Sequence, residues 1–82
     1  MLYVAYKGAD RDCQYRHAVI TADSKYDDMI VDILNYLGYK YDAFGSGNES
    51  CFYIEVDDRD EYNEFMKDWK WAKKQYKAGE LK

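Results

Sequence analysis

The sequence predicts one α+β domain over residues 1–82, with the element order ββαββα. Three observations lead to this prediction. Alternating apolar and polar residues mark strands, apolar residues at helical spacing mark two helices, and no proline, repeat or linker divides the chain. A chain of 82 residues must pack efficiently to outweigh its ordering entropy. Its ten tyrosines suggest that aromatic rings supply much of the core area.

The first two strands are predicted to form a hairpin. Leu2 to Lys7 alternates with the two-residue period of a strand. Gly8 to Asp12 has the composition of a turn. Cys13 to Thr21 ends in three β-branched residues and is expected to pair back as the second strand.

The first helix is expected to begin just after Ser24, which has Asp27 three positions later in the arrangement of a capping box. Gly38 supplies a left-handed stop. Asp28 and Asp32 fall on the solvent side as a like-charge pair, which slightly destabilises an isolated helix. The inward face comprises Tyr26, Ile30, Ile33, Leu34 and Leu37.

The second hairpin is predicted from two alternating segments around a turn. Tyr39 to Phe44 forms its first strand, Gly45 to Asn48 its turn and Cys51 to Val56 its second strand.

The second helix is expected to begin at Asp57 or Asp58, either of which can cap it with an acid three residues later, and to end between Lys77 and Gly79. Trp71 falls on the side opposite the inward stripe and should face water. Because tryptophans are enriched where binding energy concentrates, Trp71 indicates contact with a partner. The inward stripe comprises Tyr62, Phe65, Met66, Trp69, Ala72 and Tyr76.

This element order predicts a four-stranded antiparallel sheet with both helices on one face. The order is that of a ferredoxin-like sandwich in which the first strand comes from the N-terminus instead of the C-terminus. We therefore predict a permuted ferredoxin-like sandwich. One face of the sheet is then open, and the tyrosines that do not point toward the helices should line it.

Charge is distributed unevenly along the chain. The formal net charge is −4, but residues 21–64 carry twelve acids against three basic residues, a net charge of −9. Residues 65–82 carry six lysines against two acids, a net charge of +4. Helix-dipole preferences account for part of this pattern, and a solvated surface is the simplest interpretation of the remaining acids.

The sequence offers little for catalysis, so we expect a protein that is not an enzyme and needs no metal or cofactor. His17 is the only histidine. Cys13 lies four residues before it and should share its face of the strand, but no third group is evident that would orient the pair for nucleophilic catalysis. Cys13 and Cys51 are expected to be reduced thiols, although a bridge is possible if their strands are neighbours. The N-terminal residues resemble no secretory signal, and we expect a cytoplasmic protein.

Gly47 to Glu64 contains Phe52 and Ile54-Glu55-Val56 ahead of an acidic helix start. This segment, about a fifth of the chain, resembles the third strand and following helix of RNA-recognition motifs. That resemblance implies an open sheet face on which bases stack. The segment lacks the basic residue and glycine that open the family's strand motif, and the surrounding acids oppose phosphates. We therefore expect no direct nucleic-acid binding.

A protein-binding module is the function that these observations favour. In its most specific form, the acids occupy the basic nucleic-acid-binding site of a partner enzyme, since complementary charge speeds association. In size and acidity such a domain is similar to phage-encoded inhibitors of nucleic-acid enzymes, anti-CRISPR proteins among them. A domain that dimerises through its open sheet face or Trp71, and an RNA-recognition-like binder, are the alternatives. The candidate partner-binding residues are Trp71, Lys67, Lys74, Asp27, Asp28, Asp32, Asp57, Asp58, Asp60, Glu61 and Glu64.

Overall fold

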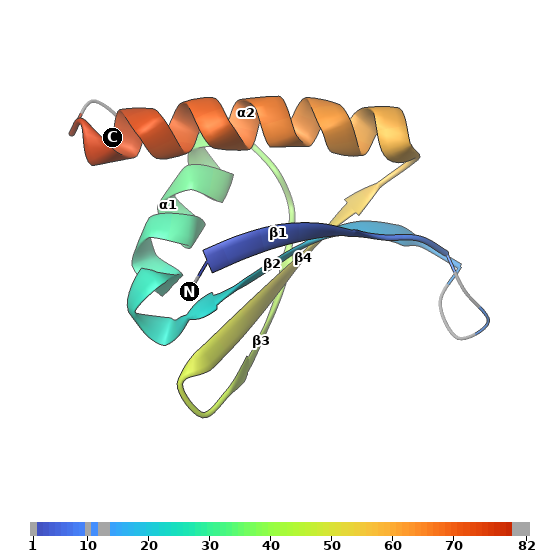
Figure 1. The fold of residues 1–82 in the computed structure, drawn as a ribbon, viewed down its shortest axis with the longest axis horizontal. Helices are drawn as coiled ribbons and strands as arrows, with labels where there is room; N and C mark the ends of the chain where they lie inside the picture. Colours follow the sequence, from blue (N-terminus) through green and yellow to red (C-terminus); the bar gives the residue numbers. More distant parts are fainter. Residues whose placement is uncertain (1, 10, 12–13, 80–82) are drawn as a thin grey trace.

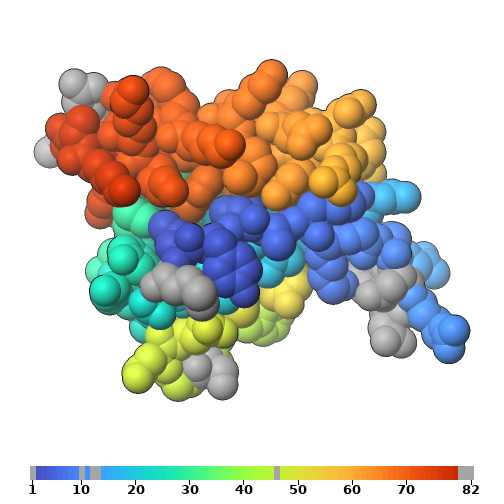
Figure 2. All heavy atoms as spheres, in the orientation of Figure 1, coloured from blue at the N-terminus to red at the C-terminus, as the bar shows by residue number. Residues whose placement is uncertain are grey.

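A four-stranded antiparallel sheet carries both helices on one face (Figure 1). The computed structural model describes residues 2–9, 11 and 14–79. In the space-filling view, α2 forms the upper layer and β1 lies beneath it (Figure 2). The elements are β1 (Leu2–Lys7), β2 (Arg16–Asp23), a 3₁₀ turn η1 (Ser24–Tyr26), α1 (Asp27–Leu37), β3 (Asp42–Ser46), β4 (Glu49–Val56) and α2 (Arg59–Lys77).

The strand order β1-β2-β4-β3 confirms the predicted topology. β2 and β4 are the central strands, and β3 lies parallel to β2 with β4 between them. The segment β2-α1-β3 is therefore a split βαβ unit, the repeating unit of ferredoxin-like folds. β1 pairs with the outer edge of β2, in the position that the C-terminal strand takes in the unpermuted order.

The core lies between the sheet and the two helices. Alternate residues of the central strands point toward the helices, and the predicted inward stripe of α2 supplies the opposite wall. Trp69 is only 2% exposed, so the predicted rotation of α2 about its axis is confirmed. The fully buried apolar residues are Ala18, Ile20, Ala22, Ile30, Ile33, Leu34, Phe52, Ile54, Val56, Phe65, Trp69 and Ala72.

The cap predicted for α2 is present, whereas the one predicted for α1 is absent. The Asp58 carboxylate accepts a hydrogen bond from the Glu61 backbone N–H at 2.8 Å. Ser24 instead opens the 3₁₀ turn, and its own N–H donates to the carbonyl of Asn48 at 2.8 Å. Ser24 thus connects to the β3–β4 turn, and no side chain caps the start of α1 at Tyr26.

Three strands have boundaries that differ from the sequence prediction. β2 runs from Arg16 to Asp23 and not from Cys13 to Thr21, and β4 begins at Glu49, two residues before Cys51. β3 is Asp42–Ser46 and not 39–44.

Local backbone bonds explain the shift of β3. Gly38, with φ 83°, ends α1, and the Tyr39 N–H still bonds to the Leu34 carbonyl at 3.0 Å. Tyr39 therefore belongs to the helix stop, and the strand begins later. At the other end of β3, the hairpin turn is only Gly47 and Asn48, with Gly47 at φ 63°, so Gly45 lies within the strand.

We expect Trp69→Ala to lower the free energy of unfolding by about 3–5 kcal/mol, because it removes a buried indole and leaves a cavity. That loss is a large share of the 5–15 kcal/mol typical of a whole domain. Urea unfolding followed by circular dichroism measures it. Trp71→Ala is the matched control, since it removes the same side chain from an exposed position of the same helix. Equal effects of the two substitutions would contradict the packing described here.

Candidate protein-binding surface

Two exposed aromatic rings from different helices stack on each other at the surface. Trp71 of α2 is 50% exposed and Tyr36 of α1 is 51% exposed. Their ring centroids are 6.3 Å apart and their planes meet at 29°. Trp71 therefore lies at the surface as predicted, but it has a neighbour within its own chain. We call Tyr36 and Trp71 the surface aromatic pair.

Tyr36 is not among the residues predicted for the site, although its position on the helix gives a signal. On a helical projection, Tyr36 lies beside Asp28 and Asp32 at four-residue spacing and outside the inward face. A large ring on the solvent-facing side of a helix is unusual, and Tyr36 on α1 shares this feature with Trp71 on α2. Its contact with Trp71 depends on how the helices cross, which the local pattern does not contain.

A second contact between the helices holds the surface aromatic pair in place. The Tyr39 hydroxyl donates a hydrogen bond to Oδ2 of Asp68 at 3.0 Å. The Tyr39 ring also packs edge-on against Phe65, with centroids 5.0 Å apart. Asp68 precedes Trp71 by one helical turn and Tyr39 follows Tyr36 by three residues. These contacts thus fix the end of α1 against the middle of α2, within two helical turns of the pair.

Opposite charges flank the surface aromatic pair. On α1, exposed Asp28 and Asp32 continue the line of Tyr36 at four-residue spacing. On α2, exposed Lys67 and Lys74 lie about one turn to either side of Trp71. The pair thus has an acidic stripe on one helix and lysines on the other.

The structure does not gather all the candidate acids around Trp71. α1 follows the end of β2 and α2 follows the end of β4, and these strands are antiparallel with Arg16 opposite Val56. The two helix starts therefore lie at opposite ends of the sheet (Figure 1), separated by about 23 Å along an eight-residue strand. The acids remote from the pair are Asp57, Asp58, Asp60, Glu61 and Glu64.

Several of these acids have structural environments of their own. The Asp58 side chain caps α2, and the Asp57 carbonyl accepts a hydrogen bond from Nη1 of Arg16 at 3.2 Å. Desolvation, followed by the nearby Asp57 carboxylate, raises the pKa of Glu61. Asp27 is half-buried, and its Oδ1 has no hydrogen-bond partner among the described residues. Of the predicted partner-binding acids, Asp28 and Asp32 are thus the two that lie in line with Tyr36 on the solvent side of α1.

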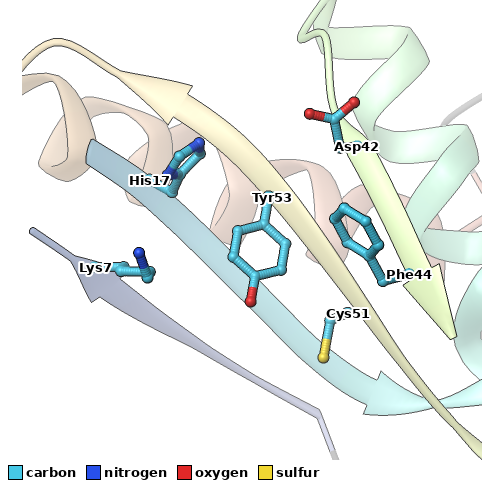
Figure 3. A pocket seen from close by; sticks show the side chains of 6 residues that line it. All are labelled: Lys7, His17, Asp42, Phe44, Cys51 and Tyr53. Carbon is cyan, nitrogen blue, oxygen red and sulfur yellow. The ribbon is translucent and has the colours of Figure 1, made fainter. Parts of the chain in front are cut away.

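A separate concavity of about 410 Å³ lies on the open face of the sheet (Figure 3). Tyr53 lies between two other rings, His17 at 5.6 Å and Phe44 at 5.4 Å between centroids, both edge-to-face. The expectation that tyrosines line this face holds for Tyr53 and Tyr3. The lining residues are Lys7, His17, Asp42, Phe44, Cys51 and Tyr53.

The predicted candidates for reactive chemistry were Cys13, His17 and Cys51. Cys13 lies outside the described residues. The structure therefore does not test its predicted placement beside His17 or its possible bridge to Cys51. Cys51 Sγ is 3.9 Å from the Thr21 hydroxyl. Within residues 2–9, 11 and 14–79, no three histidine, cysteine or acidic residues cluster in a way that could hold a metal ion. No helix in those ranges is both long and apolar enough to cross a bilayer.

No protein-family model, curated protein or solved structure matches this chain. Two surfaces of the molecule are therefore the candidate sites, the surface aromatic pair on the helices and the concavity on the sheet.

We expect Tyr39→Phe to alter how stability depends on pH. Burial, followed by the hydrogen bond to Asp68, raises the pKa of Tyr39 to about 12. Because the folded-state pKa exceeds the ordinary value of about 10, the contribution of the neutral hydroxyl is complete below pH 10 and is lost as the pH rises toward 12. Urea unfolding of both proteins between neutral pH and pH 11 tests this.

In that experiment, the stability difference between parent and Tyr39→Phe should shrink above pH 10. The other tyrosines are common to both proteins and cancel in the difference. A difference that stays constant across the range would contradict the assigned bond.

Proposed function

We propose that this chain is a non-catalytic protein-binding module whose contact surface is centred on Tyr36 and Trp71. The observation that carries the proposal is that two large rings, each about half exposed, stack on each other beside charged side chains. Tryptophan and tyrosine are typical anchors of protein interfaces, where a few residues supply most of the binding energy. A rigid pair also loses little conformational entropy when a partner covers it.

The charges around the pair indicate the chemistry of the partner. Asp28 and Asp32 favour a basic surface, and the net charge of −9 over residues 21–64 would steer such a partner toward the domain. The specific form that we propose is an inhibitor that occupies the basic nucleic-acid-binding site of a partner enzyme. This form is proposed by analogy with phage anti-defence and anti-CRISPR inhibitors. The analogy is based on size and acidity and on no sequence motif.

Lys67 and Lys74 have a different role in this proposal. They lie on α2, about one turn before and one turn after Trp71, and would contact acids at the rim of the partner's site. Rim charges contribute more to orientation and association rate than to affinity. The remote acids at the start of α2 would meet the partner only if its basic surface extends over the roughly 23 Å between the two helix starts.

Affinity capture from the source cell, with a nuclease-treated control, tests the proposal. We expect the parent protein to recover one nucleic-acid enzyme whether or not nuclease is added. Trp71→Ala should weaken that binding by 2 kcal/mol or more, as loss of an interface anchor does. It should lower folding stability by only about 0.5–1.5 kcal/mol, the value of one aromatic pair.

Phe44→Ala is the control variant, since Phe44 is 60% exposed but lies on the open sheet face. It should capture the enzyme as well as the parent does. Recovery of the protein alone would instead indicate self-association, and loss of capture after nuclease treatment would indicate bridging by nucleic acid. Either result would contradict the inhibitor proposal.

Once a partner is in hand, Asp28→Asn combined with Asp32→Asn should slow its association at low salt. The reason is that steering by complementary charge acts on the association rate and is screened by salt. Asp60→Asn with Glu64→Gln removes two charges from the other end of the sheet and is the matched control. Equal slowing by both double variants would show that only net charge matters and that the acidic stripe beside Tyr36 has no special role.

A further inference from the structure

The concavity on the open sheet face is not used by the proposed protein-binding surface. Its volume of about 410 Å³ falls within the roughly 300–1,000 Å³ of small-ligand sites. It is formed by all four strands, so rigid backbone and not a loop positions its lining. An aromatic floor with a few charged groups at its edges is the usual composition of such a site.

Tyr53 forms the centre of this floor. It lies on the central strand β4, and it is only half-buried. His17 and Phe44 meet it edge-to-face from β2 and β3, at interplanar angles of 80° and 89°. Contacts from both sides limit the rotation of the Tyr53 ring. A fixed, partly exposed phenol ring offers a flat surface on which a planar ligand can stack.

The charged residues of the concavity lie at its two edges (Figure 3). Lys7 lies on edge strand β1, opposite His17 in the β1–β2 register. Asp42 lies on edge strand β3, opposite Tyr53. Three strand spacings separate the two edges, which is roughly 14 Å. A ligand across the floor would therefore place an anionic group near Lys7 and a hydrogen-bond donor near Asp42.

His17 adds a donor on the same side as Lys7. Its Nδ1 is buried and has no hydrogen-bond partner among the residues that the structure describes. A ligand in the concavity can therefore reach the imidazole only through Nε2, which donates a hydrogen bond when it carries the ring proton.

We propose that this concavity binds a nucleotide whose base carries an amino group, such as an adenine nucleotide. The phosphate lies toward Lys7 and His17, the base stacks on Tyr53 beside Phe44, and the amino group donates to the Asp42 carboxylate. The same chemistry is present in a free mononucleotide and in an unpaired nucleotide of a single strand. Glu55 lies opposite His17 in the β2–β4 pair, so its negative charge opposes every phosphate placed at this edge. We therefore assign the site to a free mononucleotide with one phosphate, because each added phosphate of a strand would increase this repulsion.

Titration of the isotope-labelled chain with AMP, followed by amide NMR shifts, tests the proposal. We expect saturable shifts at Tyr53, Cys51 and Phe44 and none at Tyr36 or Trp71. Tyr53→Leu should weaken AMP binding at least about tenfold through loss of stacking. Tyr36→Leu, the same substitution on the helical side, should leave it unchanged. Amide spectra of both variants show whether the fold is retained.

Two comparisons identify the parts of the ligand that matter. IMP has an oxygen where AMP has the amino group, so it should bind several-fold more weakly than AMP, and Asp42→Ala should abolish that preference. A short oligoadenylate should bind no more tightly than AMP. Tighter oligoadenylate binding would overturn the assignment to a free nucleotide.

The absence of saturable shifts at millimolar AMP, or shifts that Tyr53→Leu leaves unchanged, would overturn the site itself. These outcomes are independent of the protein-binding proposal, which depends on Tyr36 and Trp71 and is tested by capture of a partner. Either proposal can therefore fail without the other.

Discussion

The antiparallel pairing of β2 with β4 determines most of what this molecule presents to its surroundings. Eight residue pairs, from Arg16 opposite Val56 to Asp23 opposite Glu49, form the central pair of the sheet. Each strand leads directly into a helix, so the two helices must start at opposite ends of the sheet. Acids collect at helix starts, where they interact favourably with the helix dipole. The same pairing therefore places these two groups of acids at opposite ends of the sheet.

The inward stripe of α2 then determines where the exposed aromatic residues lie. Burial of Phe65, Trp69 and Ala72 fixes the rotation of the helix about its axis, and that rotation leaves Trp71 at the surface. Trp71 meets Tyr36 because Tyr39 anchors the end of α1 through Asp68 and Phe65. The exposed pair is thus a consequence of buried contacts on the other side of the same two helices. Substitutions in the core should therefore disturb the surface aromatic pair as well as stability.

Local patterns predicted what depends on neighbours in the sequence. The element order, the phase of α2 and the Asp58 cap follow from periodicity and from side chains within a few residues, and the structure confirms them. Two predictions were wrong: Ser24 as the cap of α1 and residue 39 as the start of β3. The Ser24 N–H bonds to Asn48, a contact distant in sequence. The Tyr39 N–H completes the stop of α1, so the strand begins later. The surface aromatic pair and the open-face concavity require the helix crossing and the strand register, which no local pattern contains.

The tyrosines show how one composition serves both the core and the surface. Six tyrosines are half-buried and pack against the core, in agreement with the interpretation that aromatic area compensates for small size: Tyr6, Tyr26, Tyr39, Tyr41, Tyr62 and Tyr76. None of them is fully buried, because each hydroxyl needs water or a partner. Tyr3, Tyr15 and Tyr36 are exposed, as are Phe44 and Trp71. These five rings contribute little to the core and cost solubility. A domain that has to pack 82 residues efficiently therefore carries rings beyond the needs of its core. Tyr36 and Trp71 lie on the helix layer, and Tyr3 and Phe44 lie on the open sheet face. These two surfaces are where binding should be sought.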